Sequence, residues 1–346
     1  MSRPFKCLIQ QAVSGCKRVI RRNHLQDKTG QRFSGKTHET NWVIAAPHHF
    51  FVMNASIASQ NPEFHFLDFE DVFKQHDLGG INMSKVLYEK RGRIAYITLN
   101  RPETLNAVDD ELDGALWKTW ADFNADEAVD VAIVTGAGKA FCSGADLNTW
   151  LPKWEHANML DIRKNVGRGF GGGITRGQHR IYKPIIAAVN GVAVGGGLEI
   201  ALACDFRIAA ETARFASFET RRGLHQGDGG IVRIVAIAGM AVALDLALTG
   251  RMITADEAFR LGLVNRVVPD DQLMVTAEEL ASQILQNSQQ AIRSAKETIL
   301  DIIGRTLDDA LRVETLNAYS SVGDFSEVNI RLQQFYGRKE SEPGPA

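Results

Sequence analysis

The sequence has few cysteines, no excess of basic residues and no long uninterrupted apolar run. Its four cysteines are scattered among 346 residues and form neither a disulfide framework nor a paired zinc motif. The 39 Lys and Arg residues nearly balance the 41 Asp and Glu residues, so no basic excess exists to attract nucleic acid. The longest apolar runs, such as residues 184–194, are short and interrupted by glycine. We therefore expect no nucleic-acid or membrane partner, no bound metal, and a reducing, cytoplasmic location.

Phosphate-cradling motifs are also missing. Residues 171–173 are three glycines, but no predicted strand precedes them and they lack the G-x-G-x-x-G spacing. The chain contains no Walker A sequence. We interpret residues 171–173 as a loop, and the missing dinucleotide fingerprint argues against a dehydrogenase.

What is present is an ordinary globular composition that is unevenly distributed. Hydrophobic residues make up 45% and charged residues 23%, enough for a sizeable core in two domains or one large one. Residues 1–82 hold six of the nine histidines and show no lasting helical or strand periodicity. The first 26 residues contain six Lys or Arg and no acid, as an organellar transit peptide does.

A mis-assigned translation start is the interpretation we favour for residues 1–82. Met83 opens a stretch that leads directly into a predicted strand, and Gly79-Gly80 can be encoded by a purine-rich ribosome-binding sequence. We expect residues 1–82 to be an extension that is disordered or translated from upstream sequence, with a transit peptide or a genuine extension as alternatives. Mass spectrometry of the native N-terminus distinguishes them.

From Met83 onward the pattern becomes regular and predicts a layered α/β core. Strands are expected over residues 94–99, 129–135 and 184–189, and a helix is expected after Asp109 or Asp110. Strands that alternate with helices predict a layered arrangement of sheet and helix.

The C-terminal third predicts helices. Thr254 and Glu257 form a capping box, and residues 276–303 carry a long amphipathic pattern. We divide this part of the chain into a core over residues 83–252, a helical region over 253–336 and a flexible tail over 337–346.

A glycine turn at residues 195–197 is the first candidate for chemistry. It follows a predicted strand and precedes a short apolar helix, so its free N–H groups at the helix start can bind an oxyanion. Glu199 lies in the first turn of that helix. The alternative is a tight packing turn, with Glu199 as a solvated acid.

Two further segments can join this site. Residues 140–146 follow a strand and turn and can supply a second amide donor, or pack as a loop in which Asp146 caps a helix. Glu219 precedes another glycine turn, and two carboxylates that border one cavity can divide acid and base work if their pKa values differ. Spacing along the chain permits this arrangement but does not establish it.

Six short motifs in a fixed order resemble one known family. They are Asn100-Arg101-Pro102, Asn106-Ala107, and residues 140–147, 184–191, 195–199 and 227–230. Residues 248–258 and 262–269 match the usual continuation. Together these motifs resemble the crotonase, or enoyl-CoA hydratase/isomerase, family over about residues 85–336.

The resemblance implies an α/β fold, a spiral of repeated β-β-α units with C-terminal helices that build trimers. It implies an acyl-CoA partner and a homotrimer or homohexamer, with no cofactor, because coenzyme A enters as part of the substrate. The thioester oxygen is expected to lie between the backbone amides of Ala145 and Gly196. Expected substrate-binding neighbours are Asp146, Leu147, Asn106 and Ala107.

The resemblance also assigns the carboxylates. It implies that Glu199 is the base for an attacking water, that Glu219 protonates the α-carbon, and that Gly227 helps to hold the water. One carboxylate suffices to move a double bond, so the presence of two favours hydration of a 2-enoyl-CoA. The alternatives are a double-bond isomerase, another crotonase reaction such as acyl-CoA hydrolysis or decarboxylation, and a non-catalytic relative.

Several positions depart from the family pattern. Asp228 stands where a small residue is usual, and we expect it to cap the helix that follows Gly229, or else to face an oxygenated acyl chain. His225 and Gln226 replace residues that usually include proline. Lys296 matches a family lysine near the phosphates of coenzyme A. Phe170 lies in the variable segment that shapes the acyl pocket or packs in the core.

Overall fold

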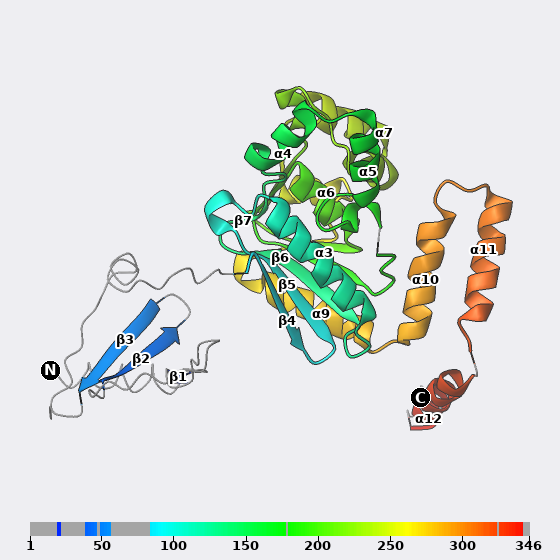
Figure 1. Ribbon diagram of the computed structural model, residues 1–346. Helices are drawn as coiled ribbons and strands as arrows, with labels where there is room; N and C mark the ends of the chain where they lie inside the picture. The colour runs from blue at the N-terminus through cyan, green and yellow to red at the C-terminus, as the bar shows by residue number, and fades with distance from the viewer. Residues whose placement is uncertain are drawn as a thin grey trace. The chain divides into compact units, whose positions relative to one another are not determined.

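The computed structural model describes residues 84–177, 179–323 and 325–341, together with three strands nearer the N-terminus. The chain divides into two units, Met1–Met83 and Ser84–Ala346 (Figure 1). In the first, β1 (Val19–Arg21), β2 (Glu39–Ala46) and β3 (His49–Ser56) pair antiparallel in that order. The sequence of this part shows no strand periodicity. The other expectations for residues 1–82 lie outside the described residues, so the translation start stays a prediction.

The second unit contains a six-stranded sheet. Its order is β13 (Arg266–Val268), β10 (Phe206–Ala210), β8 (Ile185–Val189), β6 (Val131–Gly136), β5 (Ile94–Leu99) and β4 (Val86–Arg91). All neighbours pair parallel except β4 and β5, which form a hairpin. All five residues of β8 are buried, as expected for a central parallel strand covered on both faces.

A four-stranded sheet accompanies the first. It has the order β12 (Met252–Thr254), β11 (Arg214–Ala216), β9 (Val192–Val194) and β7 (Ala140–Cys142). Only β11 and β12 pair antiparallel. Three times in succession, at β6–β7, β8–β9 and β10–β11, the chain passes from the larger sheet to the smaller one and then forms a helix. This is the expected spiral of β-β-α units.

The helices that close these units are α4 (Leu147–Glu155), α6 (Gly196–Ala203) and α7 (Gly230–Thr249). The helix α5 (Met159–Arg168) and the short 3-10 helix η2 (Ile174–Arg176) follow α4. Two further 3-10 helices, η1 (Pro102–Thr104) and η3 (Glu219–Arg222), precede α3 (Asp110–Ala125) and α7. Because each helix starts where a strand of the smaller sheet has ended, the helix N-termini bring loops from different units together.

The helix α3 (Asp110–Ala125) begins at the predicted cap, where Asp109 accepts a hydrogen bond from the Leu112 amide. It lies across β4 and β5 in Figure 1 and buries Leu112, Leu116, Trp120 and Phe123 in the main core. These four residues recur at helical spacing, so one face of α3 is apolar.

A second core lies between the six-stranded sheet and α9 (Leu273–Leu285), which is preceded by the 3-10 helix η4 (Asp270–Gln272). The smaller helix α8 (Ala255–Arg260) is capped by Thr254 at the Glu257 amide, which is one half of the predicted capping box; the Glu257 carboxylate accepts from Arg251 at 2.7 Å. Together α3 and α9 cover parts of the sheet with apolar side chains, which is why β6 and β8 are buried throughout most of their length.

The C-terminal helices are α10 (Gln289–Ile302), α11 (Leu307–Ser320) and α12 (Ser326–Ser341), with α10 and α11 side by side. The long amphipathic pattern over residues 276–303 is divided between two helices, α9 and α10. The chain breaks between Leu285 and Gln289, where the Ser288 side chain caps α10 by accepting from the Ala291 amide. The expected tail begins later than Gly337, because α12 continues to Ser341.

The helix α7 differs from the expectation that no apolar stretch is long enough to span a bilayer. Among the described residues, its 20 residues with mean hydropathy 2.2 are long and apolar enough by length and composition. Gly239, at φ +84°, interrupts the helical backbone midway. Only 17% of the apolar window is buried in this unit.

Candidate active site

Glu199 lies in the first turn of α6 and is almost completely buried, with 4% of its surface exposed. Its Oε1 accepts hydrogen bonds from the amides of Asp228 at 2.8 Å and Gly230 at 3.0 Å. These amides belong to the start of α7, so the N-terminus of one helix binds a carboxyl group that a second helix supplies. The solvated-acid alternative for Glu199 is therefore wrong.

Burial raises the pKa of Glu199 to about 7. The two amide donors oppose the shift because they favour the ionised form, whereas the negative charges of Asp228 and Glu219 add to it. A carboxyl group with such a pKa exchanges its proton near neutral pH, as an acid–base catalyst must.

Glu219 is the second carboxyl group of this region. It begins η3, and its Oε1 lies against the glycine turn, 3.2 Å from where a Cβ on Gly195 would be. The Ser217 hydroxyl donates to its other oxygen at 3.2 Å. Burial raises the pKa of Glu219 above its usual range. The fold thus brings together two carboxyl groups that stand 20 residues apart in the sequence.

The amide of Ala145 is oriented by a short parallel bridge to Val108. The Val108 amide donates to Gly144 O at 2.8 Å, and the Asp146 amide donates to Val108 O at 3.0 Å. Because N–H groups alternate in direction along an extended chain, the Ala145 N–H points away from Val108. No acceptor among the described residues binds this N–H or that of Gly196.

The loop that carries Ala145 and the turn that carries Gly196 touch through their backbones. A Cβ on Gly197 would lie 2.1 Å from Cys142 O, and one on Gly144 would lie 3.0 Å from Gly196 N. Glycine is required at these positions because any side chain would separate the two segments. The contact places two unbonded amides in one neighbourhood, which is what an oxyanion site needs.

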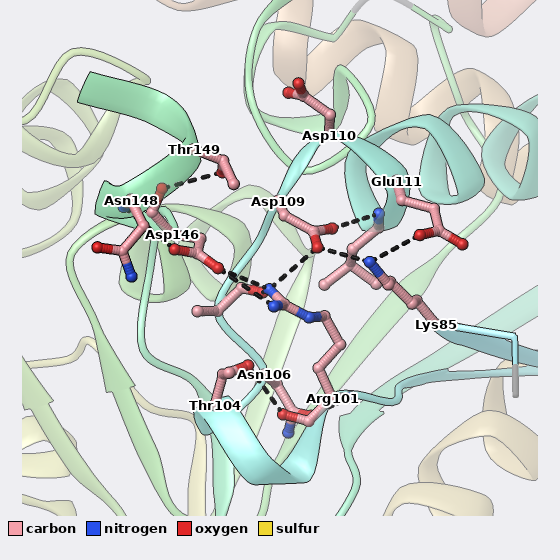
Figure 2. A network of polar contacts seen from close by, with 12 residues as sticks. Lys85, Arg101, Thr104, Asn106, Asp109, Asp110, Glu111, Asp146, Asn148 and Thr149 are labelled. Carbon is pink, nitrogen blue, oxygen red and sulfur yellow. Dashed lines mark hydrogen bonds and ion pairs between the residues drawn. The ribbon is translucent and has the colours of Figure 1, made fainter. Parts of the chain in front are cut away.

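A polar network supports the Ala145 loop (Figure 2). The Arg101 guanidinium donates to Asp146 Oδ2 at 3.1 and 3.2 Å and to Ala107 O at 2.6 Å. It also lies 3.4 Å from Asp109, which is paired with Lys85. Asp146 itself caps α4 by accepting from the Asn148 amide. Arg101 therefore connects the loop before α3 with the loop before α4.

Several residues expected to bind substrate have other partners. Asn106 is fully buried; its Oδ1 accepts from the Arg101 amide, and its Nδ2 donates to the carbonyls of Ala137 and Ala140. All three interactions hold loops together, so the Asn106 side chain has a structural position.

Three other residues that were expected to bind substrate, Lys296, Ala107 and Leu147, also have structural positions in this unit. Lys296 donates to Asp205 at 2.7 Å and to Lys183 O at 2.9 Å, which ties α10 to the core. Ala107 meets Arg101 through its carbonyl, and Leu147 is the first residue of α4.

The prediction that Asp228 caps α7 is wrong. Gly229 occupies the cap position, at φ +92°, and no side chain caps the helix there. The Asp228 carboxylate instead accepts from Arg176, at 3.4 Å, and from the Thr175 hydroxyl, at 3.5 Å. A left-handed glycine turns the chain between Asp228 and the helix, so the side chain faces η2 rather than the helix amides.

One residue near the site, Arg176, escaped the sequence-based prediction, whereas Phe170 was expected either to shape the acyl pocket or to pack in the core. Arg176 reaches Asp228 and Gly227 from η2, and the Phe170 ring lies on the Gly196 backbone, where an added Cβ would be 2.4 Å from Cε1. The only sequence signal for Arg176 was the glycine run at residues 171–173, which lets the chain turn back toward α6. The glycines of this run all have φ between +62° and +86°.

Two free amides beside two carboxyl groups with raised pKa define a site for an anion that forms next to an acid–base pair. Comparison with known proteins agrees. The family described as enoyl-CoA hydratase/isomerase matches residues 89–340. The chain therefore belongs to the enoyl-CoA hydratase/isomerase, or crotonase, family.

The matches to named relatives extend over most of each relative's length. A probable enoyl-CoA hydratase of Rhizobium meliloti is 42% identical over 261 residues, covering 74% of this chain and 96% of the relative. A short-chain-enoyl-CoA hydratase of Clostridium acetobutylicum is 38% identical over 239 residues, covering 68% and 88%. The crystal structure of an enoyl-CoA hydratase from Bacillus anthracis is similar with a TM-score of 0.66 and 36% identity, covering 73% and 96%.

Proposed function

We propose that this protein is a hydro-lyase that adds water across the 2,3 double bond of a 2-enoyl-CoA thioester. One observation carries the proposal: Glu199 and Glu219 lie at the same glycine turn as the unbonded amide of Gly196. The named hydratases among its relatives support the same reaction and an acyl-CoA substrate.

The proposed mechanism moves two protons and forms two bonds. Water attacks C3 of the enoyl group while Glu199 takes a proton from it, and the π electrons move toward the thioester to form an enolate. The amides of Ala145 and Gly196 donate to the enolate oxygen. Glu219 then gives its proton to C2, which completes the 3-hydroxyacyl product. Transfer of the proton from Glu199 back to Glu219, through solvent, restores the starting state.

The two amides contribute because the charge on the thioester oxygen grows as the reaction proceeds. A donor fixed in place stabilises the enolate-like transition state more than the neutral carbonyl. In comparable oxyanion sites the loss of one donor costs about 2.7–4 kcal/mol. Since both donors here are backbone groups held by contacting loops, they need no reorganisation during the reaction.

The proton inventory places a condition on these roles. Burial raises the pKa of Glu199 to about 7 and also raises the pKa of Glu219. The proposed roles require Glu199 to be ionised and Glu219 to hold a proton when water attacks, and the pH profiles of the two Gln variants test this requirement.

The experiment that tests the reaction is incubation of the full chain with crotonoyl-CoA in oxygen-18 water, followed by mass spectrometry. A labelled 3-hydroxyacyl-CoA supports the proposal. A shifted double bond without added oxygen would assign the protein as an isomerase, and release of free acid would assign it as a hydrolase. The Glu199→Gln variant, treated identically, controls for uncatalysed addition.

We also propose that copies of this chain assemble, as a homotrimer or homohexamer. Apolar side chains that are 51–77% exposed lie on α7, α10 and α11: Val232, Met240, Leu244, Leu248, Ile299, Leu307 and Leu311. Such surfaces are usually covered. Light scattering of the purified protein gives the mass, and a monomer would contradict the proposal.

We further propose that the protein is cytoplasmic and uses no cofactor, because coenzyme A enters as part of the substrate.

A further inference from the structure

One peptide unit of the site is held from both of its ends. The carbonyl of Gly227 accepts a hydrogen bond from Arg176 Nη2 at 2.7 Å. The amide of the next residue, Asp228, donates to Glu199 Oε1 at 2.8 Å. In a trans peptide the C=O and N–H are coplanar and point in opposite directions, so these two hydrogen bonds extend from opposite edges of one peptide group. Arg176 and Glu199 are thus connected through a single peptide group.

Nothing else among the described residues fixes the orientation of this peptide from the side of Gly227. Gly227 carries no side chain, and a Cβ placed there would meet no atom within 4 Å. A glycine in open space can rotate its peptide with little steric hindrance. If the peptide rotated, the Gly227 carbonyl would turn toward the Glu199 carboxyl and the Asp228 amide would turn away.

A second arginine completes the connection between η2 and α7. Arg233, in the first turns of α7, donates to Thr175 O at 2.7 Å and to Asp228 O at 3.3 Å. Each segment therefore supplies an arginine to a carbonyl of the other: Arg176 to Gly227, and Arg233 to Thr175. Arg233 fixes α7, and Arg176 fixes the peptide in front of it.

The charged groups facing Glu199 are Asp228 from the loop before α7, Glu219 from η3 and Arg233 from α7. Arg176 also pairs with Asp228, but this ion pair is a single contact at 3.4 Å between side chains that are 34% and 24% exposed. Solvent screens such a pair, so its contribution is small. The bond from Arg176 to the Gly227 carbonyl is shorter and does not depend on the charge of Asp228.

We propose that Arg176 is a positioning residue, which orients the Gly227–Asp228 peptide so that its N–H stays directed at Glu199. The guanidinium also polarises the peptide, which makes the N–H a better donor. Arg176 itself does not need to touch the substrate. The kinetic part of this inference rests on the proposed hydratase function, whereas the structural part does not.

The test measures the protonation of Glu199 without substrate. Infrared difference spectra across a pH titration follow the carbonyl stretch of the protonated carboxyl, and the Glu199→Gln variant identifies the band. We expect Arg176→Gln to move the midpoint upward by about one pH unit, because one charge-assisted hydrogen bond to the carboxylate is lost. Arg176→Lys, which can still donate to Gly227 O, is expected to restore most of the shift. Arg312→Gln, which removes a surface partner of Asp308 on α11, is the matched control.

The Asp228→Asn background separates the two ways in which Arg176 could act. If Arg176 acts through the peptide, Arg176→Gln raises the midpoint in this background as well. If it acts only by neutralising Asp228, Arg176→Gln has no effect once Asp228 is Asn, and the proposal is overturned. An unchanged midpoint in the single Arg176→Gln variant overturns it too.

Kinetics supplies the second readout. In an active hydratase, Arg176→Gln is expected to lower kcat/KM about tenfold below pH 7, with a smaller loss above pH 8, because the base is ionised there in both proteins. A loss of equal size at every pH would indicate general disruption of the site and contradict the proposal. If the full chain hydrates no enoyl-CoA, the proposed function fails, but the infrared titration still decides the role of Arg176.

Discussion

The guanidinium of Arg101 lies 3.1 Å from the carboxylate of Asp146, the residue directly after Ala145. Both side chains are 12% exposed, so solvent screens the pair only partly. The same guanidinium donates to Ala107 O, beside the bridge that directs the Ala145 amide. Arg101 thus positions the loop that carries the Ala145 amide, as Arg176 positions the peptide that donates to Glu199.

Replacing Arg101 tests this relationship. Arg101→Gln is expected to lower kcat for hydration about tenfold and the free energy of unfolding by about 2 kcal/mol, because charged hydrogen bonds to Asp146 and Ala107 are lost. Steady-state kinetics and chemical denaturation measure the two effects. Arg93→Gln, which breaks an Arg–Asp pair with Asp130, is the control. A destabilised Arg101 variant with normal kcat would show that the network serves stability alone.

The two carboxyl groups are expected to be individually essential. Glu199→Gln and Glu219→Gln should each lower hydration by at least about a hundredfold while the far-ultraviolet circular dichroism stays unchanged, since each removes a proton acceptor or donor. Rates of crotonoyl-CoA hydration measure the loss. Near-normal turnover in either variant would refute the corresponding role.

At Gly197 the turn that carries Gly196 contacts the backbone of the segment that leads to Ala145, and this contact gives a third prediction. Gly197→Ala puts a Cβ 2.1 Å from Cys142 O, a backbone atom, so the Ala145 loop must move away from the Gly196 turn. We expect kcat to fall about a hundredfold, as for loss of one oxyanion donor. Gly114→Ala is the matched control, because a Cβ on this helical glycine meets nothing within 4 Å. It should stabilise α3 by about 0.5–1 kcal/mol and leave kcat unchanged.

The raised pKa of Glu199 predicts how stability depends on pH. In the unfolded chain this carboxyl ionises near its ordinary value of 4.5, whereas in the folded protein it ionises at about 7. Between these values the unfolded state binds fewer protons, so the folded protein loses stability as pH rises and then loses no more above pH 7 from this group. Glu199→Gln should therefore raise Tm relative to the parent protein at pH 8 and have little effect at pH 4.5. Calorimetry at both values measures the difference, and equal gains would refute the assignment.

Much of the fold could be predicted because its signals are local. The strand over Ile94–Leu99 alternates buried and half-buried residues, and the caps at Asp109 and Thr254 are read from single side chains. The break between α9 and α10 was missed, because Asn287 and Ser288 interrupt an amphipathic pattern that continues in register on both sides.

The site could be predicted only as a set of residues. Glu199 and Glu219 were identified, but their common position at one turn depends on contacts between different β-β-α units. Arg176 meets Gly227 across 51 residues of sequence. Such a contact produces no periodic pattern in the sequence. The role of Arg176, which contacts both Gly227 and Asp228, could therefore not be inferred.

The unbonded amides of Ala145 and Gly196 have a consequence for mutagenesis. Half of the proposed catalytic apparatus is main chain, so an alanine scan would pass over it: Ala145 is already alanine, and Gly196→Ala would act by displacing Phe170 rather than by removing an N–H. Only replacement of the amide by an ester at these two positions, through semisynthesis, would delete the donor and leave the side chains intact. Sequence variation in these loops should accordingly be limited by the size of side chains rather than by their chemistry.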